Sequence, residues 1–338
     1  MYSRVAVVKP DHIGDLILAI PAIGAIASRV KETHLFVAAA NVGLASFLFP
    51  SITVSDIRFD HLNKTVDGAP QGLRSVLAPL HEYELAVFLR YDAVLNRDNL
   101  SGYLRRLVLP APSDHIHDSI IHRRSISQFF GDYDPEAFWP GPDKPIEPSA
   151  RRIGLCIASG FPTNKWSVVQ WARLATTLKK EQASELFLIG GPSERTELAI
   201  IARLAGIDDN HVMIGTQKFG SFLERVSALD LVIASDGGGG HLCSLAAPTI
   251  TISASAPFRR YAPFGRHNRV VSMDLACSPC LNAHDQLLNA CFSHECSYGI
   301  GVEDILSALV APPAAPGFRR KLKHGAHLFY ALSHVRGA

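Results

Sequence analysis

The sequence predicts an α/β protein made of two Rossmann-like domains that face one central cleft. The first observation is the stretch Leu231–Ile252, which has the pattern strand, glycine turn, helix, strand of a nucleotide-binding βαβ unit. The second is that short apolar runs alternate with helical spacing in both halves of the chain, as in parallel sheets. The third is the segment Pro140–Pro148, which has four prolines in nine residues and separates the halves as an extended linker.

Composition limits the class of protein and its partners. The chain has 338 residues, 47% of them hydrophobic, and a formal net charge of +2 with histidine neutral. This length can bury a large core in two domains, and the small net charge argues against nucleic acid as a partner. Residues 1–30 lack the layout of a signal peptide, and no apolar run is long enough for a membrane span. We therefore expect a cytoplasmic protein whose six cysteines are thiols or metal ligands.

The N-terminal domain, residues 1–140, is predicted as strands that alternate with helices. Its strands are expected at Arg4–Lys9, His34–Ala39 and Leu85–Leu89. An apolar helix from Leu16 to Val30 follows the first strand, and Pro21 kinks or restarts it. Asp15 stands at the expected N-cap of that helix, where a carboxylate contributes about 1 kcal/mol. The polar segment 115–124 is interpreted as a solvated loop, with contact to an anionic acceptor as the alternative.

The C-terminal domain, residues 151–315, follows the linker 141–150 and repeats the alternation. Its strands are expected at Arg152–Ala158, Leu186–Ile189, Val212–Ile214 and Leu231–Ala234. Its main helices are expected at Val168–Lys180 and Phe219–Leu229. Ligands of such sheets bind beyond the carboxyl ends of the strands, and Asp15, Lys165, Glu194 and Asp236 all follow predicted strands.

The glycine turn after Leu231–Ala234 is the strongest candidate for an anion site. Asp236 is followed by Gly237, Gly238, Gly239 and Gly240, and His241 opens an apolar helical stretch. Glycines let the backbone approach a phosphate closely, while the unpaired N–H groups at the start of a helix and its positive dipole end point at the ligand. The alternative is that these glycines only serve a tight turn.

Three stretches, taken together, resemble one known family. They are Val7–Leu16 with Pro21, Ile153–Gly160 with Lys165–Trp166, and Ala228–Leu242 with Pro248 and Arg260–Gly265. In this order and spacing they are similar to the ADP-heptose glycosyltransferases of family 9, which include the lipopolysaccharide core heptosyltransferases. The resemblance covers most of the chain and implies the two-domain GT-B fold.

The resemblance implies an inverting transfer of a sugar from a nucleotide-diphosphate donor, ADP-heptose being favoured, with no metal needed for the chemistry. Asp15 would be the general base that takes a proton from the acceptor hydroxyl, because inversion needs a base on the face opposite the leaving group. Lys165 and the amides of Gly237–Gly240 would bind the leaving diphosphate. A solvated surface lysine is the alternative for Lys165.

The resemblance also implies further contacts to the donor. Asp236 would accept hydrogen bonds from hydroxyls of the donor sugar, and His241 would contact phosphate or hold the turn as a structural histidine. Glu194 resembles the acidic residue that holds the ribose hydroxyls, with Glu197 as the competing choice. Many relatives have a hydroxyl residue where this chain has Gly237, which removes a side-chain donor.

Four cysteines late in the chain form a separate candidate site. Cys277, Cys280, Cys291 and Cys296 have the spacing C-x2-C-x10-C-x4-C, and the first pair is typical of zinc sites. We expect either a structural zinc or iron, which four thiolates would leave without an open position for substrate, or reduced thiols or disulfides. Some protein-modifying heptosyltransferases resemble this chain in using four cysteines for iron.

The final segment, residues 316–338, is basic first and apolar later. We expect a helix that packs back on the N-terminal domain, with contact to anionic lipid headgroups of the inner membrane as a secondary role. The acceptor is expected to be a membrane-bound glycolipid, a protein being the alternative. The non-enzyme alternative is a nucleotide-sugar-binding module that has lost its catalytic turnover.

Overall fold

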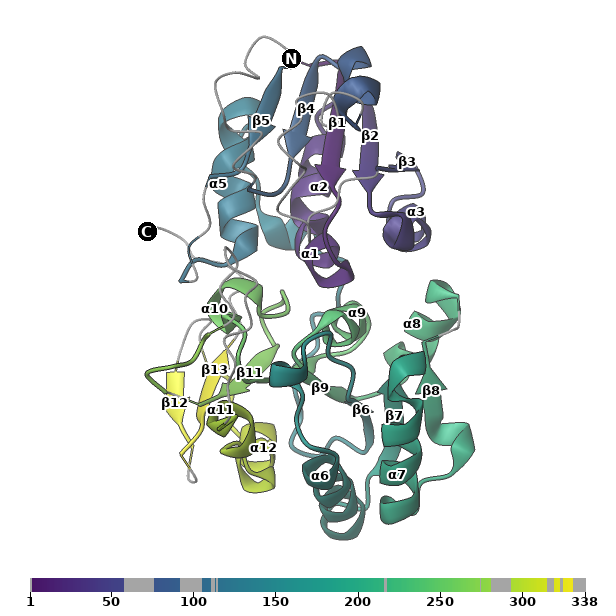
Figure 1. Ribbon diagram of the computed structural model, residues 1–338, viewed down its shortest axis with the longest axis vertical. Coiled ribbons are helices and arrows are strands. Elements are labelled where there is room, and N and C mark those ends of the chain that lie inside the picture. Colours follow the sequence, from purple (N-terminus) through teal and green to yellow (C-terminus); the bar gives the residue numbers. More distant parts are fainter. Residues whose placement is uncertain are drawn as a thin grey trace. The chain divides into compact units, whose positions relative to one another are not determined.

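The computed structural model describes residues 2–57, 76–91, 105–110, 113, 115–215, 218–273, 275–280, 293–314, 319–322 and 325–330. The chain divides into two compact units, Met1–Trp139 and Pro140–Ala338. Each unit has a sheet of mainly parallel strands with helices beside it (Figure 1). No helix of the described residues is long and apolar enough to cross a membrane.

The first unit contains a five-stranded parallel sheet in the order β3-β2-β1-β4-β5. The strands are β1 (Arg4–Lys9), β2 (Glu32–Val37), β3 (Thr53–Asp56), β4 (Leu85–Phe88) and β5 (Arg106–Val108). The central strands β1 and β4 are almost wholly buried, which explains why they are continuous apolar runs. From β1 the chain adds β2 and β3 on one side, and after β3 it returns to add β4 and β5 on the other side of β1. The strand order therefore reverses at β1, which is the position where ligands bind in doubly wound folds.

Helices and short 3-10 turns connect these strands. They are α1 (Ile13–Leu18), α2 (Ile20–Ala27), η1 (Ala39–Asn41), α3 (Val42–Leu48), η2 (Ala78–Glu82), α5 (Asp118–Phe130) and η4 (Pro135–Phe138). Pro21 lies in the first turn of α2, so the predicted restart at this proline is present. The N-cap of α1 is His12, which places Asp15 in the first helical turn. The predicted N-cap position of Asp15 is therefore wrong.

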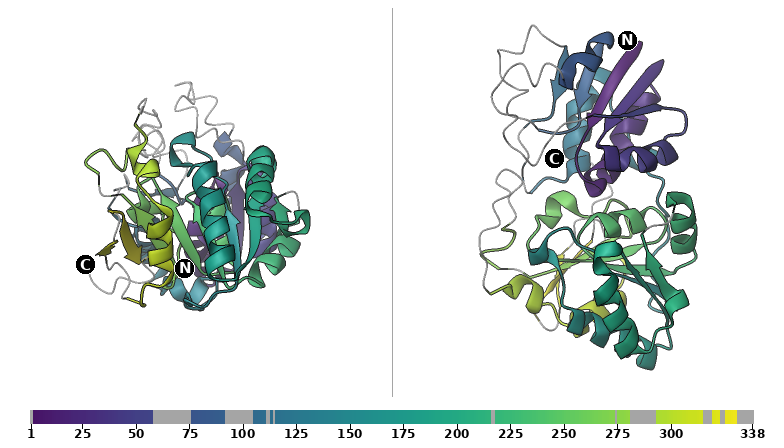
Figure 2. Two further views of the ribbon diagram at one scale, coloured as in Figure 1. Left: turned by 90° about the horizontal axis from the view of Figure 1, so that it is seen from below. Right: turned by 45° about the vertical axis from the view of Figure 1, so that its right-hand side comes forward.

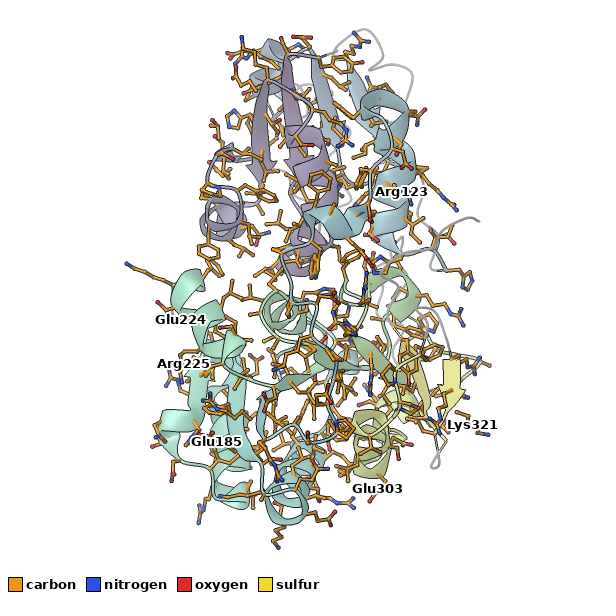
Figure 3. All side chains as sticks on the ribbon, turned by 180° about the vertical axis from the view of Figure 1, so that it is seen from behind. Arg123, Glu185, Glu224, Arg225, Glu303 and Lys321 are labelled. Atoms are coloured by element: carbon orange, nitrogen blue, oxygen red, sulfur yellow. The ribbon has the colours of Figure 1, made fainter. Side chains whose placement is uncertain are left out.

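The segment 115–124 is also not the solvated loop that its polar composition predicted. Helix α5 begins at Asp118, and the imidazole of His117 caps it by accepting from the Ser119 amide. His117 and His122 are each 1% exposed. Arg123 makes a double hydrogen bond to Asp132 near the other end of the helix (Figure 3).

The second unit contains an eight-stranded sheet in the order β12-β13-β11-β10-β9-β6-β7-β8. Its strands are β6 (Arg152–Cys156), β7 (Glu185–Gly190), β8 (Val212–Ile214), β9 (Leu231–Ser235), β10 (Thr249–Ser253), β11 (Arg269–Ser272), β12 (Arg319–Lys321) and β13 (His327–Tyr330). The six strands from β6 to β11 are parallel, and β12 and β13 are antiparallel additions. Residues 140–151, before β6, form no helix or strand.

Helices lie on both faces of this sheet, and Figure 2 shows them from two further sides. They are α6 (Val168–Glu181), α7 (Arg195–Ala205), α8 (Phe219–Ser227), α9 (Gly238–Ser244), α10 (Phe258–Tyr261), α11 (Glu295–Tyr298) and α12 (Val302–Leu309), with 3-10 turns η5 (Pro162–Asn164), η6 (Pro192–Glu194) and η7 (Asp209–His211). The apolar faces of α6, α7 and α12 share one core cluster, and those of α8 and α9 share another.

The C-terminal segment differs from the predicted helix. Residues 319–321 and 327–330 are strands, and β13 pairs antiparallel with β11 of the second unit. Gly325, with a φ of +106°, lies in the turn between them, a conformation that glycine adopts easily. The apolar residues Leu328 and Phe329 resembled one face of a helix, but in the structure they belong to a strand that satisfies backbone N–H and C=O groups at the edge of β11. The predicted helix also included residues 331–338, which lie outside the described residues.

Candidate functional site

Asp15 lies in the first unit, in the first turn of the helix that follows the carboxyl end of β1. The strand ends at Lys9, and the loop to Gly14 leads into α1. The Asp15 carboxylate is 3.8 Å from Nδ1 of His12 and keeps about 25% of its side-chain surface exposed. The positive end of the helix dipole favours a carboxylate in the first turn, which opposes the raising effect of burial on the pKa of Asp15.

The charged groups around Asp15 act in opposite directions on its proton affinity. Removal from water raises the pKa of the Asp15 carboxyl, and the negative charges of Asp11 and Asp118 raise it further. The positive charge of Lys9 lowers this pKa. The net effect is a raised pKa, which suits a group that must accept a proton.

The predicted glycine turn is present at the end of β9 in the second unit. Gly237 is the extended N-cap residue of α9, which begins at Gly238. The helix is short and ends before Pro248, whose carbonyl accepts from the Val232 amide. The structure therefore has the predicted strand, turn, helix and strand, but the helix begins at Gly238 and not at His241, so three of the four glycines are helical.

The glycines of this turn are needed for close packing as well. A Cβ atom at Gly239 would lie 2.9 Å from Sγ of Cys156, and one at Gly240 would lie 3.0 Å from Cβ of Ala234. At Gly237 a Cβ would lie 3.2 Å from the Ala158 carbonyl oxygen. Gly237 therefore lacks the hydroxyl side chain of the relatives at a point where the loop after β6 lies close to the backbone.

Asp236 is buried at the end of β9, with 6% of its surface exposed. The Ser253 hydroxyl donates to its Oδ2 at 2.8 Å. Burial raises the pKa of the Asp236 carboxyl to about 6, against the lowering effect of hydrogen bonds from Ser253 and Asn164. A buried carboxyl group whose pKa is shifted toward neutral pH is a feature of ligand-binding and catalytic sites.

Lys165 is brought together with both glutamates that the sequence left as alternatives. Its Nζ lies 3.4 Å from Oε1 of Glu194 and 3.4 Å from Oε2 of Glu197. Glu194 is buried, and its Oε2 also accepts from the Gly191 amide at 3.0 Å while Oε1 accepts from the Ser193 hydroxyl at 2.9 Å. Glu197 is one-third exposed. Lys165 is therefore not a solvated surface lysine.

Asn164 is a residue of this site that the sequence reasoning did not single out. Its Nδ2 donates to the Asp236 carbonyl at 2.9 Å, and its Oδ1 accepts from the amides of Ala254 and Ser255 at 3.0 and 3.1 Å. The side chain is 3% exposed. Asn164 thereby links the Lys165 loop to the ends of β9 and β10. In the sequence the only sign of this role was that Asn164 is a polar residue next to Lys165, the candidate phosphate contact.

His241 is 4% exposed and lies in α9. Its backbone N–H donates to the Gly237 carbonyl at 3.2 Å, and its carbonyl accepts from the Ser244 hydroxyl at 2.7 Å. These are main-chain contacts, so the structural role and the phosphate role of the His241 side chain both stay predictions.

The cysteine cluster is only partly described. Cys277 is exposed, Cys280 is half-buried and Cys296 is buried. Within the described residues no group of three or more histidine, cysteine or acidic side chains is placed to hold a metal ion. Cys291 lies outside the described residues, so the four-cysteine metal site stays a prediction.

Comparison with known family models gives a match that lies within the second unit. Residues 141–290 match the sequence model of glycosyltransferase family 9 (heptosyltransferase). No curated protein matches the chain in sequence.

Solved structures of glycosyltransferases have the same fold. A family 9 glycosyl transferase from Veillonella parvula is 16% identical with a TM-score of 0.67, covering 90% of this chain and 95% of its own. The E. coli heptosyltransferase WaaC with ADP is 16% identical with a TM-score of 0.56, covering 79% and 92%. The iron-containing dodecameric glycosyltransferase TibC from enterotoxigenic E. coli is 14% identical with a TM-score of 0.55, covering 91% and 76%. The predicted α/β GT-B fold is therefore confirmed.

Proposed function

We propose that this chain moves heptose from ADP-heptose to a lipopolysaccharide core or related cell-surface acceptor, because residues 141–290 match the sequence model of glycosyltransferase family 9 (heptosyltransferase). One observation carries the proposal: Lys165, Glu194 and the Asp236–glycine turn are linked through Asn164 in the part of the chain that matches the family. The donor is supported by relatives, since WaaC is solved with ADP and TibC with ADP-D-β-D-heptose.

The proposed reaction is an inverting displacement. The Asp15 carboxylate takes the proton of the acceptor hydroxyl while that oxygen forms a bond to the anomeric carbon. The bond from the anomeric carbon to the phosphate oxygen breaks, and ADP leaves with the electron pair. Its developing charge is stabilised by the Lys165 ammonium and by backbone N–H groups of Gly237–Gly240, which are in place before the reaction begins.

The contacts of the two glutamates suggest how they divide their roles. Both Glu194 oxygens accept hydrogen bonds within the η6 turn, so this carboxylate is fixed in orientation and suited to hold ribose hydroxyls. Glu197 pairs with Lys165 and is more exposed. We assign Glu194 to the ribose and treat Glu197 as the group that holds Lys165 before the donor arrives.

Donor identity is tested by thermal-shift titration with ADP-heptose, ADP and UDP-, GDP- and dTDP-sugars. A ligand that prefers the native state raises its stability, by about 2.7 kcal/mol at a hundred times Kd. We expect ADP compounds alone to stabilise the protein and Lys165→Ala to abolish the effect, with Lys180→Ala as the matched surface control. Stabilisation by a different nucleotide sugar would contradict the heptose donor.

Catalysis is tested with Asp15→Asn, using heptose-deficient lipopolysaccharide as the acceptor. Loss of a general base costs about 10²–10⁴ in rate, so transfer should fall by at least a hundredfold while ADP affinity stays within threefold. A non-catalytic binding module would show no transfer in the unmodified protein either. Full activity of Asp15→Asn would exclude this residue as the base.

A protein acceptor and a structural metal form the second candidate function. The spacing of Cys277, Cys280, Cys291 and Cys296 and the iron in TibC support it. Metal analysis of the purified protein should then find zinc or iron, and Cys277→Ser with Cys280→Ser should remove it. The buried Cys156 supplies the control, since Cys156→Ala should keep the metal.

We place the reaction in the cytoplasm, with the acceptor presented at the inner membrane. Strand β12 contributes the exposed cations Arg319, Arg320 and Lys321, of which Figure 3 labels Lys321. Each can add about 1 kcal/mol of attraction to an anionic surface. Charge on an edge strand also prevents edge-to-edge pairing, which is the competing explanation. Sedimentation with anionic phospholipid vesicles should fall when Arg320 and Lys321 are both changed to Glu, and zwitterionic vesicles should bind neither protein.

A further inference from the structure

Ser297 is a buried hydroxyl residue that contacts the Lys165 loop from a distant part of the chain. It lies in α11, beyond residue 290 where the match to the family model ends, and is 2% exposed. A serine hydroxyl in a helix can bond to the carbonyl of the preceding turn, as Ser307 does in α12. The Ser297 hydroxyl instead donates to the Lys165 main-chain carbonyl at 2.8 Å, 132 positions earlier in the sequence.

The backbone on both sides of Lys165 is also fixed. Before it, the Asn164 side chain makes its three hydrogen bonds to the ends of β9 and β10, and the Lys165 amide donates to the Pro162 carbonyl at 3.2 Å. After it, the indole N–H of the buried Trp166 donates to the Ile300 carbonyl at 2.9 Å. The bond from Ser297 adds the carbonyl of Lys165 itself to these fixed points.

The turn that carries Ser297 is anchored in the core of the second unit. Gly299 follows α11, and a Cβ atom there would lie 2.8 Å from the Glu295 carbonyl oxygen and 3.0 Å from Cε of Met273, just beyond β11. Ile300 is fully buried in the core cluster that α6, α7 and α12 share. Ser297 therefore belongs to a closely packed segment whose position does not depend on its bond to Lys165.

The position of the Lys165 backbone matters because its side chain is flexible. A lysine ammonium is a point charge on a four-carbon stem with large rotational freedom. The Lys165 side chain is 32% exposed, and its Nζ is held only by the contacts at 3.4 Å to Glu194 and Glu197. A cationic group that is ordered before its ligand arrives binds at a lower entropic cost. Fixing the backbone below the stem therefore favours binding of a phosphate group at Nζ.

We propose that Ser297 is a positioning residue for the donor diphosphate: its hydrogen bond to the Lys165 carbonyl fixes the backbone from which the Lys165 ammonium reaches the phosphates. Ser297 acts through Lys165 and makes no contact with the donor. The inference rests on the proposed role of Lys165 as a diphosphate contact, and it adds a residue outside the part of the chain that matches the family model.

The binding test compares Ser297→Ala with the unmodified protein by isothermal titration calorimetry, with ADP and with adenosine. We expect the Kd of ADP to rise about two- to tenfold, the net worth of one hydrogen bond. The Kd of adenosine, which has no phosphate, should stay within about twofold. Ser307→Ala is the matched control, because it also removes a hydroxyl bonded to a main-chain carbonyl, at 2.7 Å in α12. It should leave both constants unchanged.

A double-mutant cycle tests whether Ser297 acts through Lys165. In the Lys165→Ala background, Ser297→Ala should change the Kd of ADP by less than about twofold, because the ammonium that it positions is gone. A serine with a purely structural role would weaken ADP and adenosine by the same factor, or weaken ADP equally in both backgrounds. Either result would overturn the proposal.

A second variant, Ser297→Cys, keeps the volume of the side chain, and its S–H group is only a weak donor. It should remain folded in thermal unfolding and weaken ADP binding in the same direction as Ser297→Ala. Unchanged ADP affinity in both variants, with Lys165→Ala weakened, would refute the role of Ser297 alone. If the unmodified protein binds ADP no better than Lys165→Ala, the proposed function of Lys165 fails and this inference fails with it.

Discussion

At Asp236 a carboxyl group is buried at the end of β9 with the Ser253 hydroxyl on one oxygen. Its pKa of about 6 in the native protein is above the usual value for aspartate in an unfolded chain. The native state therefore binds the extra proton between about pH 4 and pH 6. Stability from this group is fully present below pH 4 and is lost as the pH rises through 6.

Asp236→Asn should consequently stabilise the protein above pH 7, by up to about 3 kcal/mol from the two-unit difference in pKa. The gain should vanish near pH 4, where the wild-type carboxyl is neutral as well. Urea unfolding of both proteins at several pH values measures this difference. In the proposed site the same change should weaken donor binding, since an amide cannot replace a carboxylate as acceptor of two sugar hydroxyls.

The matched control is Ser253→Ala, which removes the hydroxyl that favours the ionised carboxyl. It should destabilise the protein above pH 7 and have a smaller effect near pH 4. An Asp236→Asn variant that is less stable than the unmodified protein at pH 8 would contradict the assigned pKa.

Contacts at single residues were the hardest to predict from the sequence. The glycine turn and Asp236 were recognised because their residue types are unusual after an apolar strand. Asn164 was missed, because its three hydrogen bonds join loops that are far apart in the sequence. The buried state of Lys9 was also missed, because its partner Asp11 is held by Asn41 and Arg90, which are distant in the sequence.

At the scale of elements, the first residues of α9 are glycines, and the absence of side chains there lets the helix pack close to β6 and β9. Gly239→Ala would place a Cβ 2.9 Å from Cys156 Sγ. Overpacking of this kind costs about 1–3 kcal/mol, which thermal or urea unfolding can measure. Adding Cys156→Ala should recover part of the loss, because the sulfur is the atom in the way.

Gly160 supplies the control for this prediction. A Cβ at Gly160 meets no atom within 4 Å, so Gly160→Ala should change the stability by less than about 0.5 kcal/mol. Equal destabilisation by both alanine substitutions would mean that the short distance at Gly239 does not limit the packing of α9.

Strands were easier to predict than helix starts and the chain's last segment. Apolar runs such as Arg4–Lys9 and Leu231–Ala234 are buried on both faces in parallel sheets, and both are strands in the structure. The start of α1 was misplaced because His12, not an acidic or hydroxyl residue, is its N-cap. The strand β13 was mistaken for a helix because its partner β11 is distant in sequence.

At the scale of the whole molecule, the two compact units should respond differently to the donor nucleotide. If the nucleotide binds only through residues of the second unit, ADP should slow amide hydrogen exchange around Lys165, Glu194 and the turn at Gly237–Gly240. The core strands of Met1–Trp139 should exchange as before. Exchange measured by mass spectrometry tests this.

Lys165→Ala is the control, and its exchange pattern should be insensitive to ADP. Protection of equal size in β1 and β4 of the first unit would show that the nucleotide acts on both units. That outcome would be incompatible with donor recognition by the second unit alone.

The pairing of β13 with β11 also bears on how the protein is made. The strands of the first sheet all lie within residues 4–108, so that sheet can close early in translation. Strand β11 ends at Ser272, whereas its partner begins at His327, about 55 residues later. At 5–20 residues per second the ribosome needs roughly 3–11 seconds to supply them. During that interval the Val270–Val271 edge of the nascent chain is open to a strand from another molecule or to a chaperone.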